Sequence, residues 1–125
     1  MSSRNTALAH LRKAREFVDA ASSNAELGLH NAATSAAVTS GINSKDALCL
    51  VLTGRTAKSD AHSDAVKELR SAGPGMAPHA VTLGRLLKLK NRSQYDTRDV
   101  TKADARRAIE WAGRLLDAAS EAARA

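Results

Sequence analysis

Small side chains set the strongest constraint on how this chain can fold. Alanine is the commonest residue, β-branched residues are sparse, and only three aromatic residues occur, namely Phe17, Tyr95 and Trp111. Because alanine has the highest helix propensity, this composition favours helices. The shortage of aromatic residues argues against β-rich folds, and against nucleic-acid modules that stack bases on aromatic side chains. Residues 31–38 are mostly small enough to let a neighbouring helix backbone approach closely.

The length of the chain fits one domain, which we place at residues 1–125. A single cysteine excludes a disulfide framework and a cysteine-based zinc site. No apolar run approaches the roughly 18 residues of a membrane-spanning helix. The N-terminal residues lack the apolar stretch of a signal peptide. We therefore expect a cytoplasmic protein that needs no cofactor.

The spacing of apolar and turn-forming residues predicts an all-α, up-and-down bundle of five or six short helices. The first helix is expected over residues 6–21 and the second over residues 25–40, with Gly41 as its end. A third, capped by Asn43 or Ser44, would bury residues 47–52, and a loop over residues 53–59 would follow. A fourth helix would have Ala61, Ala65, Val66 and Leu69 inward. A fifth, which begins near Pro78, would carry Val81, Leu83, Leu86 and Leu87. In the last, which begins at Thr101, one face would carry Ala105, Ala108, Ile109, Ala112 and Leu116.

The positive charge is concentrated in one segment. Residues 85–107 contain eight basic and three acidic residues, and so carry +5 of the net charge of +6. A localised positive field attracts phosphate groups or an acidic protein. The alternative is an ordinary solvated helix surface.

Within this basic segment, Arg85, Lys88 and Arg92 have the spacing of one helix face. If the helix continues, Tyr95 lies next to Arg92, and Asp96 is one turn away from it. A cationic row that ends in a phenol suits a phosphate or an RNA backbone. The alternative is a surface ion pair with a locally packed tyrosine. The phosphate-binding residues that we predict are Arg85, Lys88, Lys90, Asn91, Arg92 and Arg98.

Residues suited to ordinary catalysis or to metal binding are few. The four histidines lie far apart, and no two have the spacing that places two ligands on one helix face, so we expect no metal site. The Gly-Pro-Gly sequence at residues 73–75 is interpreted as a turn rather than as a phosphate-binding loop. Cys49 lies inside an apolar run, which is typical of an inert core residue.

The order of several motifs resembles that of the small prokaryotic HEPN domain proteins over almost the whole chain. The matching segments are AREFVDAA at residues 14–21, NAATSAAV at 31–38, GINSKDAL at 41–48, Gly54-Arg55 and His62, and KNRSQYD at 90–96, followed by Val100-Thr101 and an alanine-rich helix through Trp111. The resemblance implies a helical bundle that dimerises. It also implies either an RNase, often a toxin paired with a small nucleotidyltransferase antitoxin, or a non-catalytic RNA-binding or interaction module.

The chain departs from the RNase motif of the family it resembles. In that motif an arginine, which holds the scissile phosphate, precedes a proton-transferring histidine by four to six intervening residues. After Arg92, the corresponding positions 97–99 hold no histidine, and the position that pairs with Lys90 holds Tyr95. A tyrosine with a pKa near 10 is a poor base at neutral pH.

Two other pairs, Arg4–His10 and Arg55–His62, do have the spacing of the motif. About one such pair is expected by chance in a chain with this many arginines and histidines. We interpret His62 as a capping or loop-bracing residue.

We therefore expect a HEPN-like homodimer with a degenerate catalytic motif. It would bind RNA or a nucleotide phosphate through residues 85–107, within a toxin–antitoxin or stress-response system. A second interpretation is an active, metal-independent RNase that uses Arg92 with Tyr95, or with a histidine brought in from elsewhere. A third is a non-catalytic helical interaction module whose basic face docks an acidic protein, such as a nucleotidyltransferase-type antitoxin.

Overall fold

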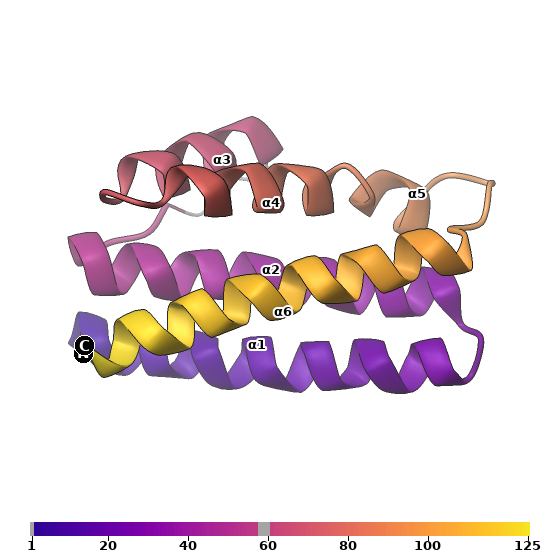
Figure 1. Ribbon diagram of the computed structural model, residues 1–125, viewed down its shortest axis with the longest axis horizontal. Helices are drawn as coiled ribbons and strands as arrows, with labels where there is room; N and C mark the ends of the chain where they lie inside the picture. The colour runs from indigo at the N-terminus through magenta and orange to yellow at the C-terminus, as the bar shows by residue number, and fades with distance from the viewer. Residues whose placement is uncertain (1, 58–60) are drawn as a thin grey trace.

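The computed structural model describes residues 2–57 and 61–125, in which every regular element is a helix. The helices are α1 (Ser3–Glu26), α2 (His30–Thr53), α3 (His62–Ser71), α4 (Ala77–Leu87), α5 (Lys90–Gln94) and α6 (Lys102–Arg124). Figure 1 shows the long helices α1, α2 and α6 running alongside one another. The short helices α3, α4 and α5 form a layer on the side of α2 and α6 that faces away from α1. The predicted all-α bundle is confirmed.

The first helix is longer than expected. The prediction that residues 22–24 end it is wrong, because these polar residues lie at or near the surface of α1 and the helix tolerates them there. The chain turns instead at Gly28, whose φ of 77° is a left-handed conformation that glycine adopts without a steric penalty. Helix α1 therefore extends to Glu26.

A single helix, α2, replaces the two that are predicted between residues 25 and 52. Gly41 does not end a helix but lies buried in the middle of α2. A Cβ at this position would overlap the side chain of Leu86, so the glycine is there to admit α4. Residues 47–50 are buried and helical as predicted, whereas Leu52 is 42 % exposed. The helix ends at Gly54, which has a φ of 80°.

The loop predicted at residues 53–59 is only partly described. Residue 53 still belongs to α2, and residues 54–57 have no regular structure. Residues 58 and 59 lie outside the described residues.

In the short-helix layer, α4 begins at a proline-containing first turn, as predicted. Of the apolar residues that this helix is predicted to carry, Leu83, Leu86 and Leu87 are buried, whereas Val81 is 46 % exposed. The chain then turns at residues 88–89 before α5 begins. This turn breaks the continuous helix that we expected to carry Arg85 and Arg92 on one face.

The start of α6 is predicted correctly. The Thr101 side chain accepts a hydrogen bond from the Asp104 N–H at 3.1 Å and so caps the helix. Ile109 is half-buried, and the other inward residues expected in this helix are buried, as predicted. At the far end of α6, the Arg4 guanidinium donates to the Ala123 carbonyl at 2.8 Å, which ties the two ends of the chain together.

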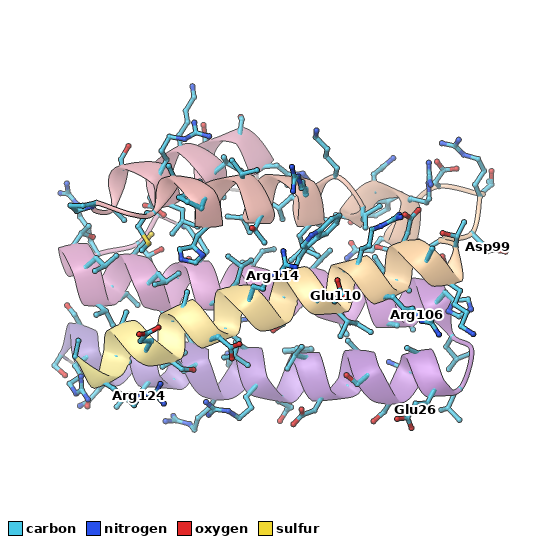
Figure 2. All side chains as sticks on the ribbon, in the orientation of Figure 1. Glu26, Asp99, Arg106, Glu110, Arg114 and Arg124 are labelled. Carbon is cyan, nitrogen blue, oxygen red and sulfur yellow. The ribbon has the colours of Figure 1, made fainter. Side chains whose placement is uncertain are left out.

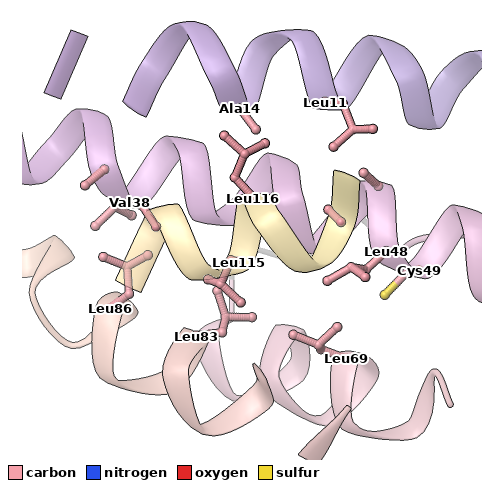
Figure 3. Close-up of a cluster of buried hydrophobic side chains, with 14 of the residues drawn as sticks. Leu11, Ala14, Val38, Leu48, Cys49, Leu69, Leu83, Leu86, Leu115 and Leu116 are labelled. Carbon is pink, nitrogen blue, oxygen red and sulfur yellow. The ribbon is translucent and has the colours of Figure 1, made fainter. Parts of the chain in front are cut away.

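The core has two kinds of contact, as Figure 3 shows. Leucines from α2, α4 and α6 interdigitate between the two layers, with Leu83, Leu86 and Leu115 fully buried. Alanines dominate between α1 and α2, so the two backbones approach closely enough for Ser40 Oγ to donate to the Ala14 carbonyl at 2.7 Å. Among the described residues, none of the helices combines the length and hydropathy needed to cross a bilayer.

Candidate phosphate-binding pocket

A cavity lies at the seam between the long helices and the short-helix layer. Its volume is about 280 Å³. Its polar lining comes from α1 (His10), α2 (Lys45 and Asp46), α3 (His62) and α5 (Lys90). Ile42, Leu83 and Leu87 are among its apolar lining residues. Titratable groups from four helices therefore meet in one small space.

A buried ion network lies beside this pocket. Lys45, which is 3 % exposed, donates to Asp46 Oδ1 and to Thr56 Oγ1, each at 3.1 Å. It also forms a salt bridge with Glu68 of α3. The Glu68 carboxylate in turn accepts a hydrogen bond from the Ala57 N–H at 2.7 Å. The network thus fastens α3 and the segment that follows α2 onto the middle of α2.

The pKa values of this network reflect competition between burial and charge pairing. Burial by itself lowers the pKa of Lys45, but the hydrogen bond to Glu68 and the charge of Asp46 outweigh burial and leave it raised. Burial likewise opposes ionisation of Glu68, but its hydrogen bonds to Lys45 and to the Ala57 N–H hold the pKa of Glu68 below its ordinary value. Both groups are therefore charged at neutral pH.

His10 is held in a fixed orientation. Asn43 donates from Nδ2 to the Thr39 carbonyl at 3.0 Å, which leaves Asn43 Oδ1 facing His10 Nδ1 at 2.8 Å. Asp46 Oδ2 lies 4.0 Å from the same nitrogen. Because both neighbours are acceptors, Nδ1 carries the proton in the neutral ring, and Nε2 remains able to accept one.

His62 and Lys90 form the other polar side of the pocket. Burial, and then the positive charge of Lys90, lowers the pKa of His62 below its ordinary value. His62 is therefore a neutral imidazole at pH 7. Lys90 is half-buried and makes no salt bridge within the described part of the chain. The pocket thus contains one unpaired cation and two imidazoles.

Of the phosphate-binding residues predicted from sequence, Lys90 alone lines this pocket. Arg92 lies 3.6 Å from Asp104 Oδ2, and Arg98 pairs with Asp96 at 2.9 Å. Lys88 lies on a groove between α3 and α4. Asn91 and Arg85 are exposed.

The Tyr95 phenol, the second residue of the predicted catalytic pair, is exposed, with 73 % of the residue accessible to solvent. It follows the last residue of α5. Arg92 pairs with Asp104, and not with Asp96, which would lie one turn away from it in a continuous helix. Neither Arg92 nor Tyr95 lies against the two pocket histidines.

The part of the basic segment that lies in α6 has an ordinary charged surface. Figure 2 shows Arg106, Glu110 and Arg114 along the outer face of this helix, where charges of both signs alternate. Arg107 is 3.2 Å from Asp104. Three of the eight basic residues of this segment are therefore paired in the fold, with carboxylates that its net charge of +5 already counts.

Sequence reasoning missed His10, Lys45 and Asp46 as site residues. The helix start predicted at Asn43 or Ser44 would put Asp46 in a first turn, whereas Asp46 lies in the middle of α2. The available signal was the polar run 43–46 directly before the apolar run 47–52, since a buried polar run needs partners from elsewhere in the fold.

Other reactive groups offer less. Burial raises the pKa of the Cys49 thiol to about 12, so the thiol is inert at neutral pH, as predicted. Within residues 2–57 and 61–125, no group of three or more histidine, cysteine or carboxylate side chains is arranged to hold a metal ion.

Comparison with known proteins places this site in a family context. The family model of the HEPN domain matches residues 7–122, which include every residue of the pocket. A comparison with curated proteins gave no match. Since the match covers nearly all of the helical bundle, the chain belongs to the HEPN family.

Proposed function

We propose that this HEPN protein binds a phosphodiester of RNA, or the phosphate of a nucleotide, in the pocket lined by His10, His62 and Lys90. The observation that carries the proposal is the convergence of these three side chains, from three different helices, on one cavity of about 280 Å³. Lys90 supplies a positive charge without a salt-bridge partner in the described residues, and the imidazoles supply hydrogen bonds. The buried network at Lys45 keeps the site in place.

The size of the cavity supports a small part of a ligand rather than a whole folded RNA. Pockets for small molecules start at about 300 Å³, so this one suits a single phosphate with its sugar or base. Sequence reasoning predicts phosphate binding along the whole basic segment. We narrow that prediction to Lys90 and its neighbours in the fold.

Calorimetric titration with a dinucleoside monophosphate, methylated at the 2′-oxygen to prevent cleavage, tests this proposal. Removing the charge with Lys90→Ala should weaken binding about 10- to 100-fold, since a hydrogen bond to a charged group contributes about 1.5–3 kcal/mol. Lys13→Ala, on the exposed face of α1, is the matched control and should change nothing. Equal affinity in both variants would overturn the proposal.

RNA cleavage is a second candidate, because two histidines line one pocket. His62, neutral at pH 7, would accept the proton of the attacking 2′-hydroxyl. His10, in the form that carries a proton on Nε2 as well as on Nδ1, would give the Nε2 proton to the departing 5′-oxygen. The 2′-oxygen forms a bond to phosphorus as the bond to the 5′-oxygen breaks, which leaves a 2′,3′-cyclic phosphate.

Cleavage of an unmethylated oligoribonucleotide in the presence of a chelator tests this candidate. His62→Gln and His10→Gln should each lower the rate about 10²- to 10⁴-fold, as expected for the loss of a general acid or base. His79→Gln, outside the pocket, is the control. Absence of cleavage by the unaltered protein would leave phosphate binding as its activity.

The homodimer and the nucleotidyltransferase-type partner stay predictions. Light scattering tests the homodimer, for which we expect a particle of twice the chain mass at micromolar concentration. A particle of the mass of one chain would contradict it.

A further inference from the structure

A second, open groove lies between α3 and α4. The two helices cross closely at Gly84, where a Cβ would lie 3.7 Å from Val66 Cγ2. Val66 and Leu87 supply the apolar part of the groove. Its polar lining consists of His62, Ser63, Lys67 and Arg70 from α3, and of Lys88 directly after α4.

The charged side chains that line this groove in the described part of the chain are all positive. Lys67, Arg70 and Lys88 are all exposed, and within the described ranges none of them forms a salt bridge. Among the residues that the structure describes, no carboxylate lines the groove. Three like charges so close together create a positive field that an anionic ligand would relieve.

The groove adjoins the pocket. His62 and Leu87 line both spaces, so a ligand that leaves the pocket past His62 reaches the groove. On α3, the distance along the helix from residue 62 to residue 70 is about 12 Å at 1.5 Å per residue. This length is greater than the size of one phosphate group. Cations border the groove on both sides, with Lys67 and Arg70 on α3 and Lys88 directly after α4.

We propose that the α3–α4 groove binds the phosphates of single-stranded RNA that neighbour the phosphate held in the pocket. This inference rests on the proposed function of the pocket. A strand with phosphates at regular intervals fits a series of cations that leads to a phosphate site. An acidic protein segment would not need a phosphate site next to the groove. Lys88 is one of the phosphate-binding residues predicted from the sequence. Lys67 and Arg70 are not among them, and the fold places them in the same groove.

The test compares 2′-O-methylated oligonucleotides of two and eight nucleotides, with fluorescence anisotropy as the readout. The triple variant Lys67→Ala, Arg70→Ala, Lys88→Ala removes the cations of the groove. The matched control, Arg12→Ala, Arg15→Ala, Arg124→Ala, removes the same charge from the groove between α1 and α6, on the side of the bundle away from α3 and α4.

The unaltered protein should bind the eight-nucleotide strand at least tenfold more tightly than the dinucleotide. The triple variant should lose this gain, keep its dinucleotide affinity, and show a slope of log affinity against log salt that is shallower by about 2, since each phosphate contact contributes about 0.7 for single strands. The control should keep both the gain and the slope.

Three outcomes would overturn this inference. The variant and the control could lose affinity equally, which would indicate general charge attraction. The strand could bind no better than the dinucleotide. Poly-glutamate could bind the unaltered protein more tightly than the triple variant, while the eight-nucleotide strand shows no such difference. That result would make the groove a docking site for acidic proteins. Failure of the proposed function of the pocket is distinguishable from these outcomes, because the unaltered protein would then not bind the dinucleotide.

Discussion

The long helices and the short-helix layer of this bundle are built in different ways. Helices α1 and α2 pack mainly through alanines and approach each other closely, as at Ser40 and Ala14. Helices α3 and α4 are short and contact the long helices through a few leucines, and the ion network at Lys45 fastens α3 to α2. The pocket lies where the two regions meet. A rigid platform with a smaller layer attached therefore lets side chains from both converge on one ligand.

The largest effect should come from the joint between the two regions. Leu86 of α4 is fully buried against Gly41 of α2. Leu86→Ala should lower the free energy of unfolding by about 2–5 kcal/mol, measured by urea denaturation, because it removes buried surface and leaves a cavity. Leu52→Ala, at a position that is 42 % exposed, should cost much less. Equal losses in the two variants would contradict this description of the joint.

A somewhat smaller effect is expected at the ion network. Lys45→Met leaves Asp46 and Glu68 without their shared cation. We expect a loss of about 2–3 kcal/mol, below the value for a fully buried pair because Glu68 is partly exposed. The exposed Lys13→Met is the control. A variant as stable as the unaltered protein would show that the leucines alone hold α3 in place.

The same network should give the stability a defined pH dependence. Because the pKa of Glu68 in the folded chain is below its ordinary value of 4.5, the unfolded chain binds more protons near pH 4. The contribution of Glu68 is therefore complete above about pH 4.5 and is lost as the pH falls through the lower folded pKa. Glu68→Gln should flatten the acid limb of a plot of unfolding free energy against pH, whereas the exposed Glu110→Gln should not. Parallel acid limbs would contradict the prediction.

The smallest effect on stability should come from the basic segment outside the pocket. Hydrogen bonds from the Arg98 side chain and N–H lower the pKa of Asp96 to about 2. Both groups are at the surface, where such pairs contribute little to stability. Arg98→Ala should therefore lower the free energy of unfolding only slightly, while the pKa of Asp96, followed by NMR, rises toward its ordinary value. A clear loss of stability would show that this loop supports the bundle.

The parts of the fold that local chemistry decides can be predicted from the sequence. The helical composition, the buried residues 47–50 and the cap at Thr101 depend on neighbours within one or two turns. Gly41 illustrates the opposite case. A glycine within a helical pattern reads locally as a stop, and the reason it does not act as one is Leu86, far away in the sequence.

The site was harder to predict for the same reason. Lys90 is found from charge density, because it lies in the segment with most of the excess charge. His10 and His62 are on different helices that no spacing rule connects, so a search for motifs does not pair them. Conversely, Arg92 fits a phosphate-binding pattern along the chain, but in the fold Asp104 lies 3.6 Å from it.

The four histidines allow the most direct test of the pocket. His10 and His62 line it, whereas His30 and His79 do not, so the chain carries its own controls. Imidazole signals can be followed by NMR during titration with the 2′-O-methylated dinucleotide. We predict saturable shifts of the His10 and His62 signals, with the His30 and His79 signals unmoved. Lys90→Ala should move these shifts to about 10- to 100-fold higher ligand concentration. Unmoved His10 and His62 signals at ligand saturation, or equal shifts of all four histidines, would contradict the assignment of this pocket as the phosphate site.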